Sequence, residues 1–343
     1  MIYKKGSIPI SFLENFVKQR MRVMPCVSIV ISALSLHVAG AAAQQWPVKP
    51  VRIIVPFPPG QAADIITRAV GERLSSVLGQ QVVIDNRPGA GAALGTELAA
   101  KAAPDGYTFL AGGSAALAIN PHLYPKIGYE TMRDFAPVTL LVSIPMVFAV
   151  TPALPAKTVQ EFIRLAKQKP GEINYGSSGN GSTSHLVSAV FASQAGISLT
   201  HVPYKGSVQA LTDLMAGQVM MVADTIPVTL ALVNAGKLRA IGISTARRAP
   251  QMPNLPTVDE QGLKGYDLQT LTSFVAPAAV QTSTLGRMSA EVVKIIAAPE
   301  INKRLVDMGF VPVGSTREVF GAFLKREHAA WQKAVQISGA KVD

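Results

Sequence analysis

The sequence predicts an α/β fold with two mainly parallel sheets, each flanked by helices. After Trp46, short β-branched runs alternate with stretches in which apolar residues recur every three or four positions, a pattern typical of strands joined by helices. The 343 residues are enough for two ordinary domains. In addition, two strand-like runs lead through glycine-containing turns into helices, at 52–74 and 173–191. We therefore expect two sheets, each with a strand, loop and helix at one edge.

The first of these units begins with a β-branched strand at 51–55. The helix that follows has apolar residues at every fourth position, from Ile66 to Leu78, and Gly79 has the place of a C-terminal glycine. The turn between strand and helix contains Gly60. Because a helix that starts just after a strand directs free backbone N–H groups over the sheet edge, this turn predicts a site for a small anion.

The remaining elements are predicted in chain order. Strands are expected at 82–84, 107–110, 138–142, 147–150, 173–175, 219–222 and 240–243, and helices near 158–169, 186–191, 210–215 and after 315. Thr158 and Glu161, and again Ser315 and Glu318, have the spacing of a capping box. The last helix has an apolar face made by Phe320, Phe323, Leu324, Trp331 and Val335.

Residues 1–43 have the order of a secretory signal peptide. Basic residues up to Arg22 precede the apolar run 27–36, and alanines 41–43 provide small residues for cleavage. The run is shorter than the roughly 20 apolar residues of a membrane span, which disfavours an anchor helix. The stretch before Met21 is long for a signal peptide, so Met21 is a second candidate start. The expected location is the bacterial periplasm.

Composition excludes several classes of protein. The only cysteine, Cys26, precedes the apolar run, so the mature chain has no disulfide and no cysteine nucleophile. The histidines at 122, 185, 201 and 328 lack metal-ligand spacing, and we expect no metal site and no cofactor. The net charge is +11, of which segment 1–45 contributes +4. No long basic block follows, which argues against nucleic acid and leaves a mild attraction for anions.

Two glycine-rich segments suggest chemistry that their spacing does not support. Gly89, Gly91 and Gly95 leave one residue too many for a dinucleotide-binding G-x-G-x-x-G, so we expect a loop that passes close to a neighbour. Segment 176–182 lacks the G-x-S-x-G of a serine hydrolase with Ser178 as nucleophile. We interpret it as a second anion-binding loop before a helix. His185 is then either a packed, hydrogen-bonded residue or a ligand contact.

Two carboxylates have alternative roles. Asp64 either contacts a ligand or complements the positive end of its own helix. Asp224 follows the predicted strand 219–222, where a buried carboxylate needs a partner such as a ligand amine, a ligand hydroxyl or a backbone donor.

Eight motifs, in order from Trp46 to the C-terminus, resemble the solute receptors of tripartite tricarboxylate transporters, the Bug family. The motifs are Pro56-Phe-Pro-Pro-Gly-Gln-Ala-Ala-Asp64, Asn86-Arg-Pro-Gly-Ala-Gly91, Ala103-Pro-Asp-Gly-Tyr107, Ala118-Ile-Asn-Pro121, Asp134-Phe-Ala-Pro-Val138, Gly176-Ser-Ser-Gly-Asn-Gly-Ser182, His201-Val-Pro-Tyr-Lys-Gly206 and Pro312-Val-Gly-Ser315.

The resemblance implies a two-lobed periplasmic binding protein of type II-like fold with a ligand cleft between the lobes. It implies lobe 1 at 46–147 plus 275–343 and lobe 2 at 148–274. The ligand residues it implies are Phe57, Gly60, Gln61, Asp64, Gly113, Ser114, Ser178, Gly179, Asn180, Gly181, Ser182 and Asp224. Gln61 stands where the family usually has a second glycine, and Leu271 stands near a position that is often aromatic.

The function that the resemblance implies is capture of a small carboxylate for the membrane components of such a transporter, by a monomer without enzymatic activity. A receptor that presents its ligand to a sensor kinase is an alternative, and a hydrolase that uses Ser178 is a third.

Overall fold

The computed structural model describes residues 46–342. The predicted signal peptide, Cys26 and the alternative start at Met21 lie outside the described residues. Within the described part, no helix combines the length and apolar character needed to cross a membrane.

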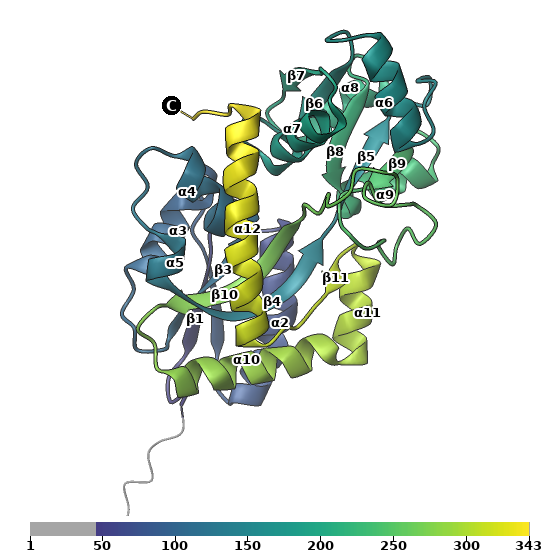
Figure 1. Cartoon of the computed structure of the whole chain (residues 1–343). Coiled ribbons are helices and arrows are strands. Elements are labelled where there is room, and N and C mark those ends of the chain that lie inside the picture. The colour runs from purple at the N-terminus through teal and green to yellow at the C-terminus, as the bar shows by residue number, and fades with distance from the viewer. Residues whose placement is uncertain (1–45, 343) are drawn as a thin grey trace, which may run out of the picture. The chain divides into compact units, whose positions relative to one another are not determined.

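The first sheet has six strands in the order β11-β4-β10-β3-β1-β2 (Figure 1). Strand β1 pairs in parallel with β2 and β3, whereas β10 is antiparallel to β3 and β4. The strands are β1 (Val51–Val55), β2 (Val82–Asn86), β3 (Thr108–Gly113), β4 (Phe135–Ile144), β10 (Thr270–Pro277) and β11 (Val311–Pro312).

The second sheet has five strands in the order β7-β6-β8-β5-β9. Strand β6 is parallel to β7 and β8, and β5 is antiparallel to β8 and β9. The strands are β5 (Met146–Val150), β6 (Asn174–Ser177), β7 (Thr200–Pro203), β8 (Met221–Thr225) and β9 (Arg239–Ile243).

The expected α/β architecture with two sheets is confirmed, with the difference that both sheets are mixed. In each sheet an antiparallel strand is the one by which the chain arrives from the other sheet: β5 follows β4 across Pro145 alone, and β10 follows the segment after β9. Neither arrival is a crossover helix within one sheet, the connection that neighbouring parallel strands need.

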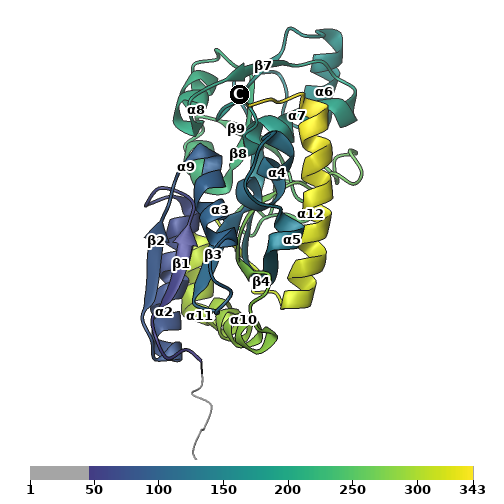
Figure 2. The same cartoon turned by 90° about the vertical axis from the view of Figure 1, so that its left-hand side faces the viewer.

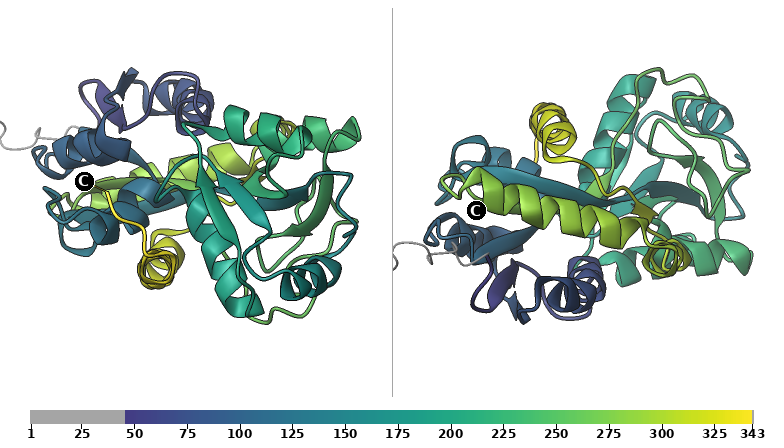
Figure 3. Two further views of the ribbon diagram at one scale, coloured as in Figure 1. Left: turned by 90° about the horizontal axis from the view of Figure 1, so that it is seen from above. Right: turned by 90° about the horizontal axis from the view of Figure 1, so that it is seen from below.

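Helices cover both faces of the first sheet. Figure 3 shows α2 and α12 on opposite sides of it. On the α12 face, Phe320 and Leu324 join a buried cluster with Ile54 and Leu110. The helices are α2 (Ala62–Leu78), α3 (Ala93–Ala100), α4 (Asn120–Leu123), α5 (Thr131–Asp134), α6 (Val159–Gln168), α7 (Thr183–Ala195), α8 (Ser207–Met215), α9 (Ile226–Asn234), α10 (Thr282–Ala297), α11 (Pro299–Asp307) and α12 (Arg317–Ser338), with short turns η1 (Ala90–Ala92) and η2 (Ala115–Ile119).

The last helix contributes to both cores. Helix α12 runs along the first sheet, and its C-terminal end lies beside α7 (Figures 1 and 2). There Trp331 is fully buried in a cluster with Phe148 and Phe191 of the second sheet's core. The predicted apolar face of this helix is confirmed at its four buried members, Phe320, Leu324, Trp331 and Val335.

The first predicted capping box forms its N-cap bond, although its Glu161 carboxylate accepts the N–H of Lys157 and not that of Thr158, and the second box does not form. Thr158 Oγ1 accepts the N–H of Glu161 at 3.2 Å, as expected. Ser315, however, does not cap α12, because its Oγ accepts the N–H of Leu140 at 3.1 Å. Thr316 caps the helix instead, since its Oγ1 accepts the N–H of Val319 at 3.4 Å. The Ser315 hydroxyl is thus bonded to the backbone of β4 and is not available to cap α12.

Two further predictions have clear outcomes. Gly95 does lie in a close approach, because a Cβ there would stand 2.5 Å from the Arg87 carbonyl oxygen. The strand predicted at 219–222 is displaced to 221–225, so Asp224 lies within β8 and not after it. The strand begins later because the N–H of Val219 donates to the Asp213 carbonyl in the preceding turn and so does not pair with a neighbouring strand.

Candidate functional site

The first group of predicted ligand residues lies at the carboxyl ends of β1 and β3. These strands are parallel, with Arg52 opposite Thr108, so Phe57 and Gly113 lie at the same level. A Cβ at Gly113 would stand 3.8 Å from the Phe57 ring. Ser114 follows directly and is 1% exposed. The structure therefore brings the loop after β1 and the end of β3 together.

Asp64 is buried and fixes the conformation of the loop after β1 through hydrogen bonds. Its carboxylate is 2% exposed and accepts the N–H of Gly60 at 2.9 Å through Oδ2 and the Asn86 amide at 2.9 Å through Oδ1. Arg68 pairs with Oδ1 at 2.9 Å. Burial by itself raises the pKa of Asp64, but the hydrogen bonds from Arg68, Gly60 and Asn86 outweigh burial and lower the pKa below its usual value. The Asp64 oxygens are thus engaged within the protein.

Asn86 is a positioning residue that sequence reasoning missed. Its amide donates to Asp64 and also to the Phe57 carbonyl at 3.1 Å, while its Oδ1 accepts from Arg68 at 2.9 Å. The available signal was its place at the start of the motif Asn86-Arg-Pro-Gly, although nothing local in that motif indicates a partner 22 residues earlier.

The backbone N–H groups that α2 offers to a ligand belong to its first turn. Gly60 has φ +82°, a conformation that favours glycine, and its N–H is taken by Asp64. Gln61 is the N-cap with φ −80°, so its side chain causes no strain, and no side chain caps the helix. Because the first N–H groups of a helix have no partner within it, those of Ala62 and Ala63 face outward from this end.

The second predicted loop, between β6 and α7, is held by hydrogen bonds to β6, to the first turn of α7 and to the C-terminal segment. The N–H of Ser178 donates to Ser184 Oγ at 2.8 Å, that of Gly179 to Ser177 Oγ at 3.2 Å, and that of Gly181 to His185 Nδ1 at 3.1 Å. Asn180 donates its amide to the Lys341 carbonyl at 2.8 Å. Ser182 is the N-cap and accepts the N–H of His185 at 3.3 Å. These bonds give the loop one defined conformation.

Two stacked histidines lie beneath this loop. The rings of His185 and His201 are 3.8 Å apart and 5° from parallel, and Tyr175 stacks on His201 at 4.9 Å. His201 Nε2 lies 2.7 Å from Ser177 Oγ. Burial, and then the nearby charge of His201, lowers the pKa of His185 to about 4, and burial lowers the pKa of His201. His185 is therefore packed and hydrogen-bonded, the first of the two roles considered for it.

The serine geometry is unlike that of a hydrolase. Ser178 Oγ lies 3.0 Å from Ser184 Oγ. The serine that contacts a histidine is Ser177, which is fully buried. A buried hydroxyl cannot reach a substrate carbonyl, so this arrangement lacks an accessible serine–histidine pair.

Asp224 carries an unsatisfied carboxylate oxygen. The pairing of Gly176 with Val222 on parallel strands places Asp224 level with Ser178. Asp224 is 6% exposed, and its Oδ1 accepts the N–H of Thr225 at 2.7 Å, whereas Oδ2 is buried without a partner. Burial raises the pKa of this carboxyl, and the nearby Ser207 and Thr225 groups lower it by less. The Ser207 hydroxyl thus lies close to the carboxyl, although no hydrogen bond to Oδ2 forms. An unpaired buried oxygen is costly and indicates that a hydrogen-bond donor is missing.

The loop between β6 and α7 packs against α4, which follows the first group of predicted residues in the sequence. A Cβ at Gly181, whose φ is +72°, would stand 2.6 Å from Leu123 Cδ2. Leu123 is in α4, which follows Ser114 through η2. The second loop thus contacts α4, the helix that follows the end of the first group in the chain.

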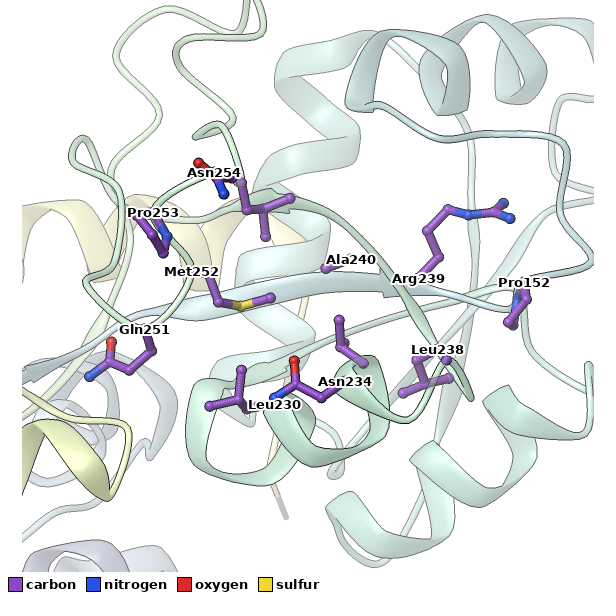
Figure 4. Close-up of a pocket in the computed structure, with 13 residues that line it drawn as sticks. Pro152, Leu230, Asn234, Leu238, Arg239, Ala240, Gln251, Met252, Pro253 and Asn254 are labelled. Atoms are coloured by element: carbon purple, nitrogen blue, oxygen red, sulfur yellow. The ribbon is translucent and has the colours of Figure 1, made fainter.

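The cavity in Figure 4 is separate from these residues. It has a volume of about 610 Å³ between α9, β9 and segment 251–255, with Leu230, Leu238 and Met252 in its wall. Its one guanidinium, Arg239, donates to the carbonyls of Leu154 and Ala156 at 2.9 and 3.3 Å. Among residues 46–342, no group of three or more His, Cys, Asp or Glu side chains is placed to hold a metal ion.

Comparison with known proteins identifies relatives over nearly the whole chain. Residues 66–339 match the family described as "Tripartite tricarboxylate transporter family receptor". The protein BugT of Bordetella pertussis (strain Tohama I) is 31% identical over 322 residues, covering 94% of this chain and 98% of BugT.

Two solved structures are similar in fold and sequence. Rpa4515 of R. palustris, solved with adipate, is 34% identical with a TM-score of 0.74, covering 87% of this chain and all of that one. MatC (Rpa3494) of Rhodopseudomonas palustris, with bound malate, is 29% identical with a TM-score of 0.70, covering 84% of this chain and all of that one. The two-lobed α/β fold expected from the motifs is confirmed.

Proposed function

The chain belongs to the tripartite tricarboxylate transporter receptor family, and from this premise we propose that it captures a small carboxylate in the periplasm after removal of its signal peptide. The family is one of solute-binding receptors and not of enzymes. We take lobe 1 as 46–147 plus 275–343 and lobe 2 as 148–274, with the ligand held between them. The twelve residues named above, from Phe57 to Asp224, are the proposed ligand contacts and loop positions.

The observation that carries this proposal is the pair of preorganised loops, one in each sheet, each opening a helix. A carboxylate would accept N–H groups from the first turns of α2 and α7, at Ala62, Ala63 and Thr183. Hydrogen bonds to a charged group contribute about 1.5–3 kcal/mol each. Three of them contribute about 4.5–9 kcal/mol before the ordering cost. Micromolar affinity, about −8 kcal/mol, would therefore need further contacts, such as the one proposed at Asp224.

The free oxygen of Asp224 would accept a hydrogen bond from a ligand hydroxyl or ammonium group. Adipate, bound by one relative, has no such donor, whereas malate, bound by the other, has a hydroxyl. We therefore favour a hydroxy- or amino-substituted carboxylate as ligand. Closure of the lobes around it would create the form that the membrane components recognise.

Calorimetry on refolded, ligand-stripped protein tests the proposal with adipate, malate and a sugar panel. We expect carboxylates to bind without turnover. Asp224→Asn should weaken malate binding more than adipate binding, and Asp259→Asn, at a half-buried turn outside the proposed contacts, should change neither. Heat with sugars or cations but with no carboxylate would refute the proposal.

We further propose that the protein is a monomer. The transporter membrane components are the proposed recipients of the liganded form, and a sensor kinase is the alternative. Copurification of the liganded protein with each membrane partner distinguishes the two.

A further inference from the structure

A cavity of about 390 Å³ lies where the chain crosses between the two sheets. Ser143 and Pro145, at the β4–β5 junction, and Gln269, just before β10, form part of its wall. Loop 245–248 lies on one side, and α12 with segment 311–315 on the other. None of the twelve proposed ligand residues lines it. The cavity is therefore distinct from the site described above.

The lining is positively charged. Three arginines and one carboxylate line the cavity: Arg247, Arg248, Arg326 and Asp267. Arg248 is paired with Glu260 at 2.9 Å. Within residues 46–342, neither Arg247 nor Arg326 has a carboxylate at ion-pair distance, and the Arg326 guanidinium lies 5.7 Å from the Phe323 ring centroid. Asp267 already accepts the N–H of Ala246 at 3.0 Å. Two guanidinium groups are thus available to an anion.

The rest of the wall is largely apolar. It extends from the buried side chains of Leu140 and Phe320 to Val313 and Val319, which are 42% and 60% exposed. These exposed valines lie next to the arginines that have no carboxylate partner. The cavity therefore presents both an uncovered apolar surface and an unpaired positive charge.

We propose that this cavity binds a small organic anion with one carboxylate and an aliphatic tail. The planar guanidinium of arginine suits a carboxylate because it can donate two parallel hydrogen bonds. The volume is within the range of small-molecule sites, in which a mostly apolar wall carries a few polar groups. An inorganic anion would leave the apolar wall in water, and a neutral alkyl compound would leave the arginines unpaired.

Octanoate is the probe, measured by calorimetry against the full-length protein purified without ligand. We expect saturable binding that weakens about tenfold or more in Arg247→Ala/Arg326→Ala, because two charged hydrogen-bond donors are lost. Lys325→Ala is the matched control, since Lys325 is an exposed neighbour on α12 outside the lining, and it should bind octanoate normally. Inorganic phosphate and octanol should each bind about tenfold more weakly than octanoate.

A second variant, Val319→Trp, keeps the arginines but fills the space for the tail, and should also weaken octanoate binding. Malate binding and thermal melting, measured on every variant, show whether the fold is intact and whether the proposed site between the lobes still works. Octanoate affinity that is equal in the native and double-arginine proteins, or an absence of saturable octanoate binding, would overturn the inference. Failure of malate and of every other carboxylate in the panel to bind would instead count against the proposed function, since the octanoate result depends on the lining of this cavity.

Discussion

The carboxylate of Asp64 accepts the backbone N–H of Gly60, four residues earlier, at 2.9 Å. This bond closes the loop after β1 onto the first turn of α2. Asn86, at the end of β2, bonds to the same carboxylate and to the Phe57 carbonyl. The loop is therefore held by side chains from the first turn of α2 and from the end of β2, and its outward donors are set before any ligand arrives.

Asp64→Ala should lower the free energy of unfolding by about 2–3 kcal/mol, because it removes charged hydrogen bonds in a buried position. Carboxylate affinity should fall with it, since the Gly60 N–H and the Asn86 amide are left unpaired. Urea unfolding and calorimetry measure the two effects. Asp105→Ala, which removes an exposed pair with Lys49 and an exposed hydrogen bond from the Tyr107 N–H, is the control and should cost at most about 1 kcal/mol. Equal losses of unfolding free energy in the two variants would contradict the role of Asp64 in fixing the loop after β1.

His185→Leu should weaken carboxylate binding about fivefold, because the N–H of Gly181 loses its acceptor and the second loop loosens. His185→Asn is the matched variant, since an asparagine Oδ1 stands near the position of Nδ1 and still accepts this bond. Calorimetry with malate should therefore separate the two substitutions, and identical affinities would argue against positioning by His185.

The same histidine should make stability depend on pH. Its pKa in the folded protein is about 4 and its ordinary value 6.5, so between these values the unfolded chain binds the proton more readily. Stability should fall as pH decreases from 6.5 to 4, by at most about 3 kcal/mol. Unfolding curves across this range should show a smaller slope in His185→Asn, and an unchanged slope would contradict the assignment.

Glu327 should make the stability of the protein depend on pH in the opposite direction. Burial raises its pKa to about 7, although Trp331 donates its indole N–H to the carboxylate at 3.0 Å. Because the folded protein then binds a proton that the unfolded chain releases above its ordinary value of 4.5, stability should fall as pH rises from 4.5 to 7. Glu327→Gln keeps an acceptor for Trp331 and should flatten this fall in thermal melts. A fall of the same size in the variant would mean that another group causes it.

Gly181→Ala should destabilise the protein by about 1–3 kcal/mol, because the residue has φ +72° and an added Cβ would meet Leu123. Gly286→Ala is the contrasting control, since nothing lies within 4 Å of its Cβ position in α10 and alanine favours a helix by about 1 kcal/mol. The two variants should shift the melting temperature in opposite directions. A neutral Gly181→Ala would show that the second loop does not need this close approach.

Elements with strong local signals were predicted well. Strand β1 and the apolar face and glycine end of α2 are found where the pattern places them, since periodicity and capping act within a few residues. Strands β7, β10 and β11 and helices α4, α5, α9, α10 and α11 were not predicted, and β8 begins two residues later than expected. The candidate site was predicted at the level of loops, whereas the bonds that occupy Asp64, Ser178 and His185 were not.

The sequence by itself determined an α/β chain with two strand–loop–helix units, and its motifs indicated a carboxylate receptor. Tertiary structure decided which partners each polar group takes: Asn86 for Asp64, Leu140 for Ser315, and a stacked His201 for His185. It also decided that Asp224 keeps a free oxygen and that two arginines without a carboxylate partner line the same cavity. The physical reason is range, because periodicity and capping depend on near neighbours in the chain, whereas hydrogen-bond partners and cavities depend on which distant segments meet.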